Sequence, residues 1–516
     1  MGSKSISPNE SLSPRLNRRP LFWACAFVIV LVSLLWLPRM TWSALRHWDE
    51  AWYAEMSREM IANGDWLTIY WNDAPNFHKP PLAFWGTTVA FLSLGVSEFS
   101  ARLVSSLCGL GTVLLVTVFI GRQRGIWLGL AAGLILVAIP EFSRYATRGQ
   151  LEGPIAFWIA LQLMLFWRGL ENPRWHWASG AAFGLALMTK GAAGGLAPVV
   201  EISYGVLARD LRFMKQKEWW LSFVLGGLIA VPWHFHQWGV HGDVFLRDYF
   251  SRHFLQFFSD IYPEVDTPGA PATYYLDFLI RKQPEWGWIV LAAWLLATIV
   301  LVRHRSDRLF VFAWCWSTVL PVALSFAWAK WNWYLVPIYP GFAMLVAIAI
   351  GQLKWADGKA APRWALAAAM LAMISGSEVF WRAQNRELEG DLRTIGPVIE
   401  QEIEPSDRVL TLQVRSARKS VYAVTTRYYG RRNVQAIMGV DQLERTAESA
   451  GNVVPALVHN DLLNDVRLRG VRSQKSDPGY DVEVVATRGQ VSLVRLTPGW
   501  LADQLNQAAR KSAVSR

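Results

Sequence analysis

The chain has 516 residues, of which 53% are hydrophobic and 29 are tryptophan, and its mean hydropathy is +0.20. This composition argues against two or three soluble domains and makes a lipid bilayer the expected solvent. The formal net charge is +11, but the basic residues stand in short clusters between apolar runs, which is typical of loops between membrane helices and not of a nucleic-acid-binding surface.

The N-terminus combines a basic stretch with the first long apolar run. Residues 1–20 are predicted to form a cytoplasmic tail, because arginines precede the apolar run 21–38. A signal peptide can look similar, but no small-residue cleavage site follows, so we expect a retained first helix. Further apolar runs, most of them near the length that spans a bilayer, occupy 81–97, 101–121, 125–142, 152–168, 176–189, 191–208, 219–238, 286–303, 308–328, 331–351 and 362–381.

The charges between these runs predict a topology. Five connections are basic and are placed in the cytoplasm: Arg122/Arg124, Arg168 to Arg174, Arg209 to Lys217, Arg303 to Arg308, and Lys354 to Arg363. Loops 39–80 and 239–285 and the chain after 382 then lie outside. This requires an odd number of crossings, so 81–97 is interpreted as a helix that packs from the outer side, leaving eleven spans, or else one crossing is missed and there are thirteen.

The fold class expected for residues 21–381 is therefore an all-α polytopic membrane domain with 11 to 13 transmembrane helices. After residue 382 the composition changes, and strand-like runs alternate with helix-compatible stretches. A small soluble α/β domain over 382–516, on the periplasmic or extracytoplasmic side, is predicted. Its strands are expected at 409–414, 434–438, 454–460, 482–489 and 491–496.

Two adjacent carboxylates, Asp49 and Glu50, stand in the first outer loop, soon after the first helix. One of them can accept a proton from a hydroxyl nucleophile while the other orients it or holds a metal ion. The alternative is a solvated helix end beside interfacial aromatic residues.

Two lysines are candidate phosphate ligands. Lys79 precedes Pro80-Pro81, and because prolines start a helix at a defined place they also define where the ammonium points. A snorkelling interfacial lysine would look the same. Lys190 lies between two apolar runs with glycines on both sides, and an ionisable residue in such a place is a functional hypothesis by default.

Three further outer segments carry polar groups. Arg148 and Glu152 flank the loop before a helix, where Glu152 could hold a hydroxyl or a cation, or simply form an ion pair. The stretch 247–254 sets cations beside aromatics and suits an anionic lipid headgroup, although a plain interfacial helix explains it nearly as well. Lys330 and Tyr334 are predicted one turn apart on one face of a helix start, where a phosphate would meet both.

The motifs WDEAWYAEMSREMIANGDWL, HKPPLAFW, SRYATRGQLEGP, GLALMTKG, VPWH and KWNWYLVPIYP occur in this order over about residues 20–351. This pattern resembles the ArnT-like bacterial branch of the protein mannosyltransferase superfamily. The resemblance implies a GT-C fold and an enzyme that takes a sugar from a polyprenyl (undecaprenyl) phosphate.

By the same resemblance, Asp49 is the general base or metal-proximal carboxylate, with Glu50 beside it. The donor phosphate or lipid is expected to meet a larger set: Tyr53, Lys79, Lys190, Arg252, His253, Lys330 and Tyr334. Arg148 and Glu152 form the second acidic or acceptor position.

Two departures from the family pattern bear on these assignments. Glu152 stands where the family usually has Asp. In the long loop, Gln256 replaces the usual arginine, so that Arg252 or Arg247 would have to supply the charge.

Asp49, Glu50 and Glu152 could hold Mg²⁺ or Mn²⁺, and histidines nearby in the motifs could recruit Zn²⁺. No nucleotide-binding loop is found, so no nucleotide cofactor is expected. The predicted function is inverting transfer of a sugar to a lipid A-like or other envelope acceptor on the outer side of the inner membrane.

Four alternatives stay open at this point. They are a protein O-mannosyltransferase, a lipid-carrier transporter or flippase, a non-catalytic envelope scaffold, and an oligosaccharyltransferase. The last is disfavoured because residues 382–516 lack a WWD-type motif.

Overall fold

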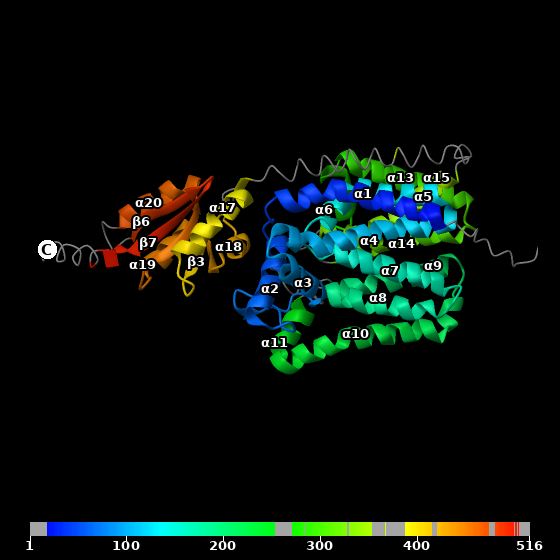
Figure 1. Cartoon of the computed structure of the whole chain (residues 1–516), viewed down its shortest axis with the longest axis horizontal. Helices are drawn as coiled ribbons and strands as arrows, with labels where there is room; N and C mark the ends of the chain where they lie inside the picture. Colours follow the sequence, from blue (N-terminus) through cyan, green and yellow to red (C-terminus); the bar gives the residue numbers. More distant parts are fainter. Residues whose placement is uncertain are drawn as a thin grey trace, which may run out of the picture. The chain divides into compact units, whose positions relative to one another are not determined.

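The computed structural model describes residues 18–252, 271–282, 284–327, 330–352, 367, 387–414, 421–473, 480–499, 501–502 and 504 (Figure 1). The chain forms two compact units. We call residues 1–40, 77–83 and 102–381 the helical unit, and residues 41–76, 84–101 and 382–516 the mixed unit. The predicted span 362–381, apart from residue 367, and nearly all of the predicted tail lie outside the described residues.

The helical unit is built almost entirely of helices. The longer ones are α1 (Arg18–Trp42), α4 (Glu98–Arg124), α5 (Ile126–Ala138), α7 (Glu152–Gly169), α8 (Trp175–Lys190), α9 (Leu196–Leu207), α10 (Lys217–His241), α13 (Pro284–Arg303), α14 (Arg308–Ser325) and α15 (Tyr339–Gly351). Short helices connect them: α6 (Pro140–Ala146), η1 (Gly191–Gly195), η2 (Arg212–Lys215), α11 (Asp243–Phe245), η3 (Leu246–Arg252), α12 (Tyr274–Asp277), η5 (Phe278–Lys282) and η6 (Asn332–Ile338).

Several helical segments are long and apolar enough to cross a membrane. Among the described residues there are five, Arg19–Trp42, Glu98–Arg124, Trp175–Leu207, Arg308–Ser325 and Asn332–Gly351, and the bent pair of α5 and α6 would make a sixth. The 77° bend of that pair lies at Pro140, which cannot donate the hydrogen bond a continuous helix needs. These spans confirm a polytopic α-helical membrane domain, while the number of 11 to 13 stays a prediction.

The segment Trp175–Leu207 is not one straight rod. A Cβ built on Gly194 would lie 2.6 Å from the backbone nitrogen of Leu187, which precedes it by seven residues. Residues seven positions apart in a straight helix are separated by about 10 Å along the axis, so the chain turns back between α8 and α9. The turn contains Gly191, whose φ of +53° favours glycine, and it lies where the predicted apolar runs 176–189 and 191–208 meet.

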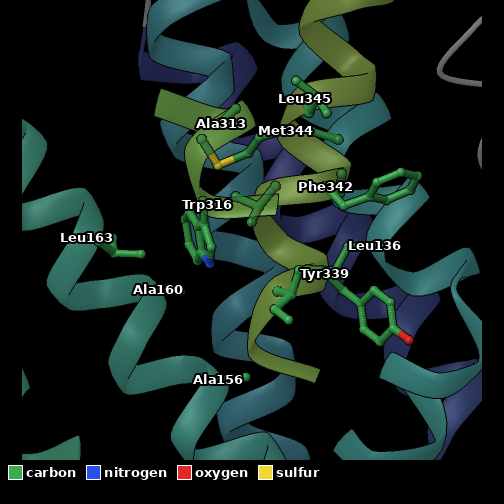
Figure 2. Packing of buried hydrophobic residues seen from close by; sticks show 14 of the residues in the cluster. Leu136, Ala156, Ala160, Leu163, Ala313, Trp316, Tyr339, Phe342, Met344 and Leu345 are labelled. Carbon is green, nitrogen blue, oxygen red and sulfur yellow. The ribbon is translucent and has the colours of Figure 1, made fainter. Parts of the chain in front are cut away.

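Tight packing holds these helices together. Trp316 of α14 is fully buried against Gly341 of α15, and its Nε1 donates a hydrogen bond to the Pro337 carbonyl at 2.9 Å (Figure 2). Helix α8 lies between α7 and α10 (Figure 1). Small residues let α8 approach α10, since a Cβ on Gly180 would lie only 2.3 Å from the Ser222 carbonyl oxygen.

The mixed unit contains a five-stranded sheet of order β4-β3-β5-β7-β6. Its strands are β3 (Arg408–Gln413), β4 (Asn433–Met438), β5 (Val454–His459), β6 (Tyr480–Arg488) and β7 (Val491–Pro498). Strand β3 pairs in parallel with β4 and β5, whereas β7 pairs antiparallel with β5 and β6. All five strands were expected within two residues of their observed ends, which confirms the small sheet-containing region.

Helices cover both faces of this sheet. Successive residues of a strand point to opposite faces, so Leu410 packs in one apolar cluster and Val409 in the other. The first cluster includes residues of α19 (Val440–Glu448) and α20 (Asn460–Ser473), and the second includes residues of α17 (Glu387–Glu402). Continuous burial along β3 and β5 follows from this double cover.

The remaining part of the mixed unit comes from the first loop of the chain. It comprises α2 (Asp49–Asn63), a hairpin of β1 (Tyr70–Trp71) and β2 (Ala74–Pro75), and most of α3 (Leu82–Leu94). The hairpin was not predicted, although Asn72 and Asp73 favour the positive φ values of 56° and 66° that its tight turn requires. Helix α18 (Ala423–Gly430) packs against α2 within this unit.

Candidate functional site

The helical unit contains a pocket with an empty volume of about 730 Å³, part of it open solvent. Parts of the chain that are far apart in sequence form its wall: His78, Lys79, Pro80, Ile155, Lys190, Gly191, Ala192, Ala193, Leu196, Tyr249, Leu324, Trp333, Tyr334 and Pro337. The wall combines two lysines and two tyrosines with aliphatic and proline side chains. Such a lining suits a ligand that carries an anionic group next to an apolar body.

Lys190 ends helix α8 at the turn described above, which directs its ammonium group into the fold instead of along the helix axis. Its Nζ lies 2.5 Å from Oε1 of Glu152 and 5.4 Å from the centre of the Tyr334 ring. Both charged side chains are largely buried. The second oxygen of Glu152 is buried and has no hydrogen-bond partner among the described residues, so it can accept a bond from a ligand hydroxyl.

Lys79 lines the same pocket from a different part of the chain. It is followed by Pro80 and Pro81, and α3 begins at the next residue, as the two prolines predicted. The structure thus brings Lys79, Lys190 and Tyr334 together at one pocket, although the first and last of them are more than 250 positions apart in the sequence.

The predicted arrangement of Lys330 and Tyr334 on one α-helical turn is wrong. Trp331 is extended, and a 3₁₀ helix, η6, follows from Asn332 to Ile338. The reason is Pro337, which cannot donate to residue 333 as an α-helix would require. Tyr334 lines the pocket, whereas Lys330 is not part of its wall and is 4% exposed. Burial lowers the pKa of Lys330 below its ordinary value.

Tyr249 was not among the predicted site residues. It lies in η3, a π-helical turn, and its hydroxyl is 2.9 Å from Nε2 of His234, a residue of α10. Burial raises the pKa of Tyr249, so its hydroxyl stays protonated at neutral pH and can donate a hydrogen bond. The signal available in the sequence was His234 in the VPWH motif, but nothing local pairs it with a residue 15 positions later.

Arg148 and Glu152 are close in sequence but have different surroundings. The guanidinium carbon of Arg148 lies 5.0 Å from the centre of the Tyr145 ring, and the hydroxyl of Tyr145 accepts a hydrogen bond from Asn332 at 3.2 Å. Tyr145 also contacts Trp333 of the pocket wall, at 6.2 Å between ring centres. Arg148 therefore contacts Tyr145, which packs against the pocket wall, whereas Glu152 binds Lys190, which is itself part of the wall.

The predicted acidic pair begins helix α2 in the mixed unit. Glu50 is 1% exposed, and its Oε2 accepts the backbone N–H of Arg46 at 2.9 Å. Trp48, immediately before Asp49, has φ +64° and ψ −136°, a strained conformation for a bulky side chain. Tyr53 is buried and packs edge-on against Phe84 at 5.4 Å. Strained backbone of this kind is common at functional sites.

Two predicted ligands are not described in full. Arg252 is the last residue of η3, and nothing is known of its side chain, while His253 lies outside the described residues.

A divalent cation at the acidic residues stays a prediction. Within the described ranges, no group of three or more His, Cys, Asp or Glu residues could hold a metal ion. Oε1 of Glu152 is already matched by an ammonium group, so this atom does not fit a cation site. Asp49 and Glu50 stay predicted cation ligands.

Comparison with known proteins places this architecture among membrane glycosyltransferase folds. A family model described as dolichyl-phosphate-mannose-protein mannosyltransferase matches residues 78–236. The crystal structure of ArnT from Cupriavidus metallidurans bound to undecaprenyl phosphate has a TM-score of 0.73 at 21% identity, and covers 92% of this chain and 98% of that one. At 21% identity this likeness shows the GT-C fold. The resemblance to the ArnT-like branch is confirmed by the family match together with the curated relatives.

Curated relatives carry more specific names. Two are called undecaprenyl phosphate-alpha-4-amino-4-deoxy-L-arabinose arabinosyl transferase: one from Shewanella sediminis, 24% identical over 64% of this chain and 58% of its own length, and one from Pectobacterium carotovorum, 28% identical over 63% and 59%. The chain thus aligns with just under three fifths of these relatives. Together with the apolar helices, they identify a multi-pass inner-membrane protein.

Proposed function

We propose that this protein transfers a sugar from a polyprenyl-phosphate donor to a lipid A-like or other envelope acceptor at the outer side of the inner membrane. The observation that carries the proposal is the meeting of Lys79, Lys190 and Tyr334 at one pocket of the helical unit. Two ammonium groups and a phenol match the charge and the acceptor oxygens of a phosphate. The names of the relatives and the bound ligand of the ArnT structure support the same donor class.

The pocket lining is consistent with both parts of such a donor. Ile155, Leu196 and Leu324 offer apolar surface to a polyprenyl chain, while the lysines stand beside the phosphate. Glu152 holds the Lys190 ammonium in place at 2.5 Å before any ligand binds. A cation positioned in advance costs little reorganisation when charge develops on the departing phosphate, which is how electrostatic stabilisation accelerates a reaction.

The proposed reaction is an inverting displacement. An acceptor hydroxyl attacks the anomeric carbon, its proton passes to a carboxylate, and the bond from the anomeric carbon to the phosphate oxygen breaks. The polyprenyl phosphate leaves with its additional negative charge near Lys79 and Lys190. Asp49 is proposed as the base and Glu50 as its neighbour, on the strength of the motif and the strained turn before Asp49.

Acceptor identity is the main alternative within this proposal. The family model that matches residues 78–236 is described for a mannosyltransferase that acts on protein, and this favours a protein hydroxyl as second candidate acceptor. A lipid-carrier transporter would need the same phosphate pocket but would break no glycosidic bond.

Mass spectrometry of membrane lipids and envelope glycans tests these candidates. Cells would contain the wild-type protein, the variant Lys190→Met, the variant Asp49→Asn, or no protein. The control variant is Lys215→Met, at an exposed position of η2. We expect one sugar modification to be lost with both site variants and kept with the control, and its attachment point identifies lipid or protein as acceptor. An unchanged modification profile with mislocalised polyprenyl-linked sugar would overturn the transferase in favour of the transporter, and full transfer by Asp49→Asn would remove Asp49 as base.

A further inference from the structure

The turn that leads into the acidic pair is strained. Trp48 has φ +64°, a value that a tryptophan adopts only where its surroundings hold it. The backbone N–H of Trp52 closes the first turn of α2 on the Trp48 carbonyl at 2.9 Å. The conformation of Trp48 therefore determines where Asp49 and Glu50 point, and contacts on both sides of it must supply the restraint.

On the N-terminal side, two tyrosines of the C-terminal part of the chain make these contacts. The hydroxyl of Tyr429 accepts the backbone N–H of Leu45 at 2.8 Å and donates to Glu98 at 3.1 Å. The ring of Tyr422 stacks on His47, with 4.1 Å between ring centres and 4° between planes. Tyr429 lies in helix α18 and Tyr422 caps its N-terminus, so one short helix binds residues 45 and 47.

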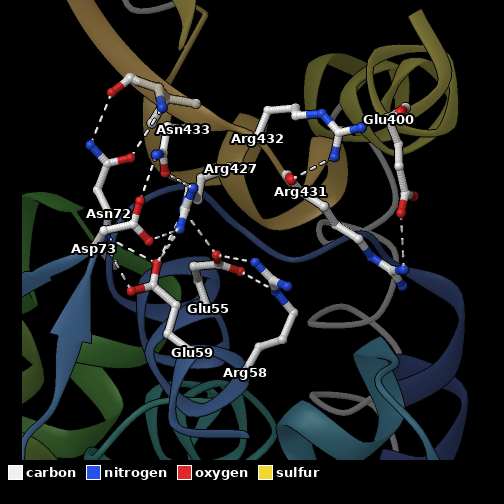
Figure 3. A network of polar contacts seen from close by, with 11 residues as sticks. Glu55, Arg58, Glu59, Asn72, Asp73, Glu400, Arg427, Arg431, Arg432 and Asn433 are labelled. Carbon is white, nitrogen blue, oxygen red and sulfur yellow. Dashed lines mark hydrogen bonds and ion pairs between the residues drawn. The ribbon is translucent and has the colours of Figure 1, made fainter. Parts of the chain in front are cut away.

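On the C-terminal side, Arg427 of the same helix binds α2. Its guanidinium lies 3.1 Å from Glu55, 2.8 Å from Glu59 and 3.2 Å from Asp73 of the hairpin (Figure 3). Arg427 is 6% exposed, and Glu55 and Glu59 are buried as well. Buried charges of this kind are costly to separate, so their mutual geometry is firmly fixed.

Glu55 is shared between two arginines. Arg58 of α2 also binds it, at 2.6 Å, so the cluster alternates acid and base across the contact between the helices (Figure 3). Burial raises the pKa of Glu55, and the two arginines oppose that effect. Removing Arg427 would leave carboxylates of α2 and the hairpin with less compensating charge and would loosen the helix on which the acidic pair stands.

We propose that α18 is a clamp that holds the Trp48–Asp49 turn from both sides, with Tyr422, Arg427 and Tyr429 as positioning residues for the acidic pair. All these contacts lie within the mixed unit. The inference rests on the proposed function in one respect, namely that the acidic pair takes part in transfer. Residues 382–516 of the mixed unit thereby acquire a positioning role in the reaction.

The mildest test is Tyr429→Phe, which removes one hydroxyl and is expected to fold. The matched control is Tyr480→Phe, which also removes one tyrosine hydroxyl; that hydroxyl donates to the Val466 carbonyl at 2.8 Å, away from α2. In the purified full-length protein, we expect Tyr429→Phe to speed amide exchange of residues 45–52 by about threefold to tenfold. Its kcat should fall by about tenfold or more while KM for the donor stays within about twofold, because misplacement of a reacting group affects the chemical step.

The second variant pair tests the charge cluster. Arg427→Gln should show the same two effects more strongly, and Arg427→Lys should restore part of both. Arg431→Gln serves as the control, because the ion pair that Arg431 forms with Glu400 is half-exposed.

The two readouts separate the clamp from the proposed function. If the amides of residues 45–52 exchange at the wild-type rate in both Tyr429→Phe and Arg427→Gln, the clamp is overturned, whatever the activity of the two variants. Faster exchange with unchanged kcat would overturn its positioning role. If the wild-type protein itself transfers no sugar from a polyprenyl-phosphate donor, the proposed function falls, and the exchange data still decide whether α18 holds the turn.

Discussion

Lys190 and Glu152 form a largely buried ion pair. Substitutions in this pair should affect the stability of the protein and its transfer activity separately. Lys190→Met leaves a buried carboxylate without its counter-charge and should cost about 3–5 kcal/mol of stability. The double variant with Glu152→Gln removes that carboxylate charge and should recover most of the loss. Sugar transfer should stay impaired in both, because the ammonium is absent. Thermal unfolding and donor-dependent rates measure the two effects, and recovery of transfer in the double variant would contradict a phosphate role for Lys190.

Asp210, in the connection after α9, gives the clearest pH dependence. Its carboxylate binds Arg212 at 2.8 Å and also Arg308, and these contacts lower the pKa of Asp210 to about 2. An unfolded aspartate has a pKa of about 3.9, so the stabilisation is fully present above pH 4 and is lost as the pH falls through about 2.

Asp210→Asn should therefore lower the unfolding free energy by about 1 kcal/mol, equally at pH 7 and pH 5, with a smaller difference only below about pH 4. Asp277→Asn, in an exposed pair with Arg281, is the control and should change little. Thermal unfolding at pH 7, at pH 5 and below pH 4 checks both variants, and a difference that does not become smaller below about pH 4 would show that the pKa of Asp210 is not lowered.

Helices α8 and α10 approach each other through small residues, and we expect larger side chains at this contact to destabilise the protein. Gly180→Ala puts a methyl group 2.3 Å from a backbone carbonyl of α10, and overpacking of this kind costs about 1–3 kcal/mol. Gly227→Ala is the matched control, because nothing lies within 4 Å of its new Cβ. Alanine is about 1 kcal/mol better than glycine in a helix, so the control should be neutral or stabilised. Equal melting temperatures for both variants would show that α8 and α10 are not closely packed.

Elements with a local signal were predictable from the sequence, and those created by distant contacts were not. Strand-like apolar runs located β3 and β7 to within two residues. The motif lysines 79 and 190 were expected to bind one ligand, and they do line one pocket. The prediction that Lys330 and Tyr334 lie one α-helical turn apart was wrong, because Pro337 imposes 3₁₀ turns on this segment. The contacts of Arg427 with Glu55, Glu59 and Asp73 had no signal at all, because these partners are more than 350 positions away.

At the scale of the whole molecule, the basic connections of the helical unit meet one another. Arg124 binds Asp307, Arg308 binds Asp210, and His176 contacts Gln216 at 2.8 Å. These contacts join four of the five connections that the charge pattern assigned to the cytoplasm, or the residues next to them. The fifth connection lies outside the described residues. The positive-inside rule therefore applies to them as one group, and they should all face the same compartment.

This orientation can be tested with single cysteines in a chain whose three native cysteines, Cys25, Cys108 and Cys315, are replaced by alanine. One cysteine is Ser306→Cys, at an exposed position of the basic connection from Arg303 to Arg308. The other is Ala272→Cys, at an exposed position of loop 239–285, which is predicted to lie outside. In intact spheroplasts, a membrane-impermeant maleimide should label Ala272→Cys and leave Ser306→Cys unlabelled until the membrane is opened, because only one side of the bilayer is accessible. Labelling of Ser306→Cys alone would reverse the orientation and, with it, the side of the membrane on which the lysine pocket meets its donor.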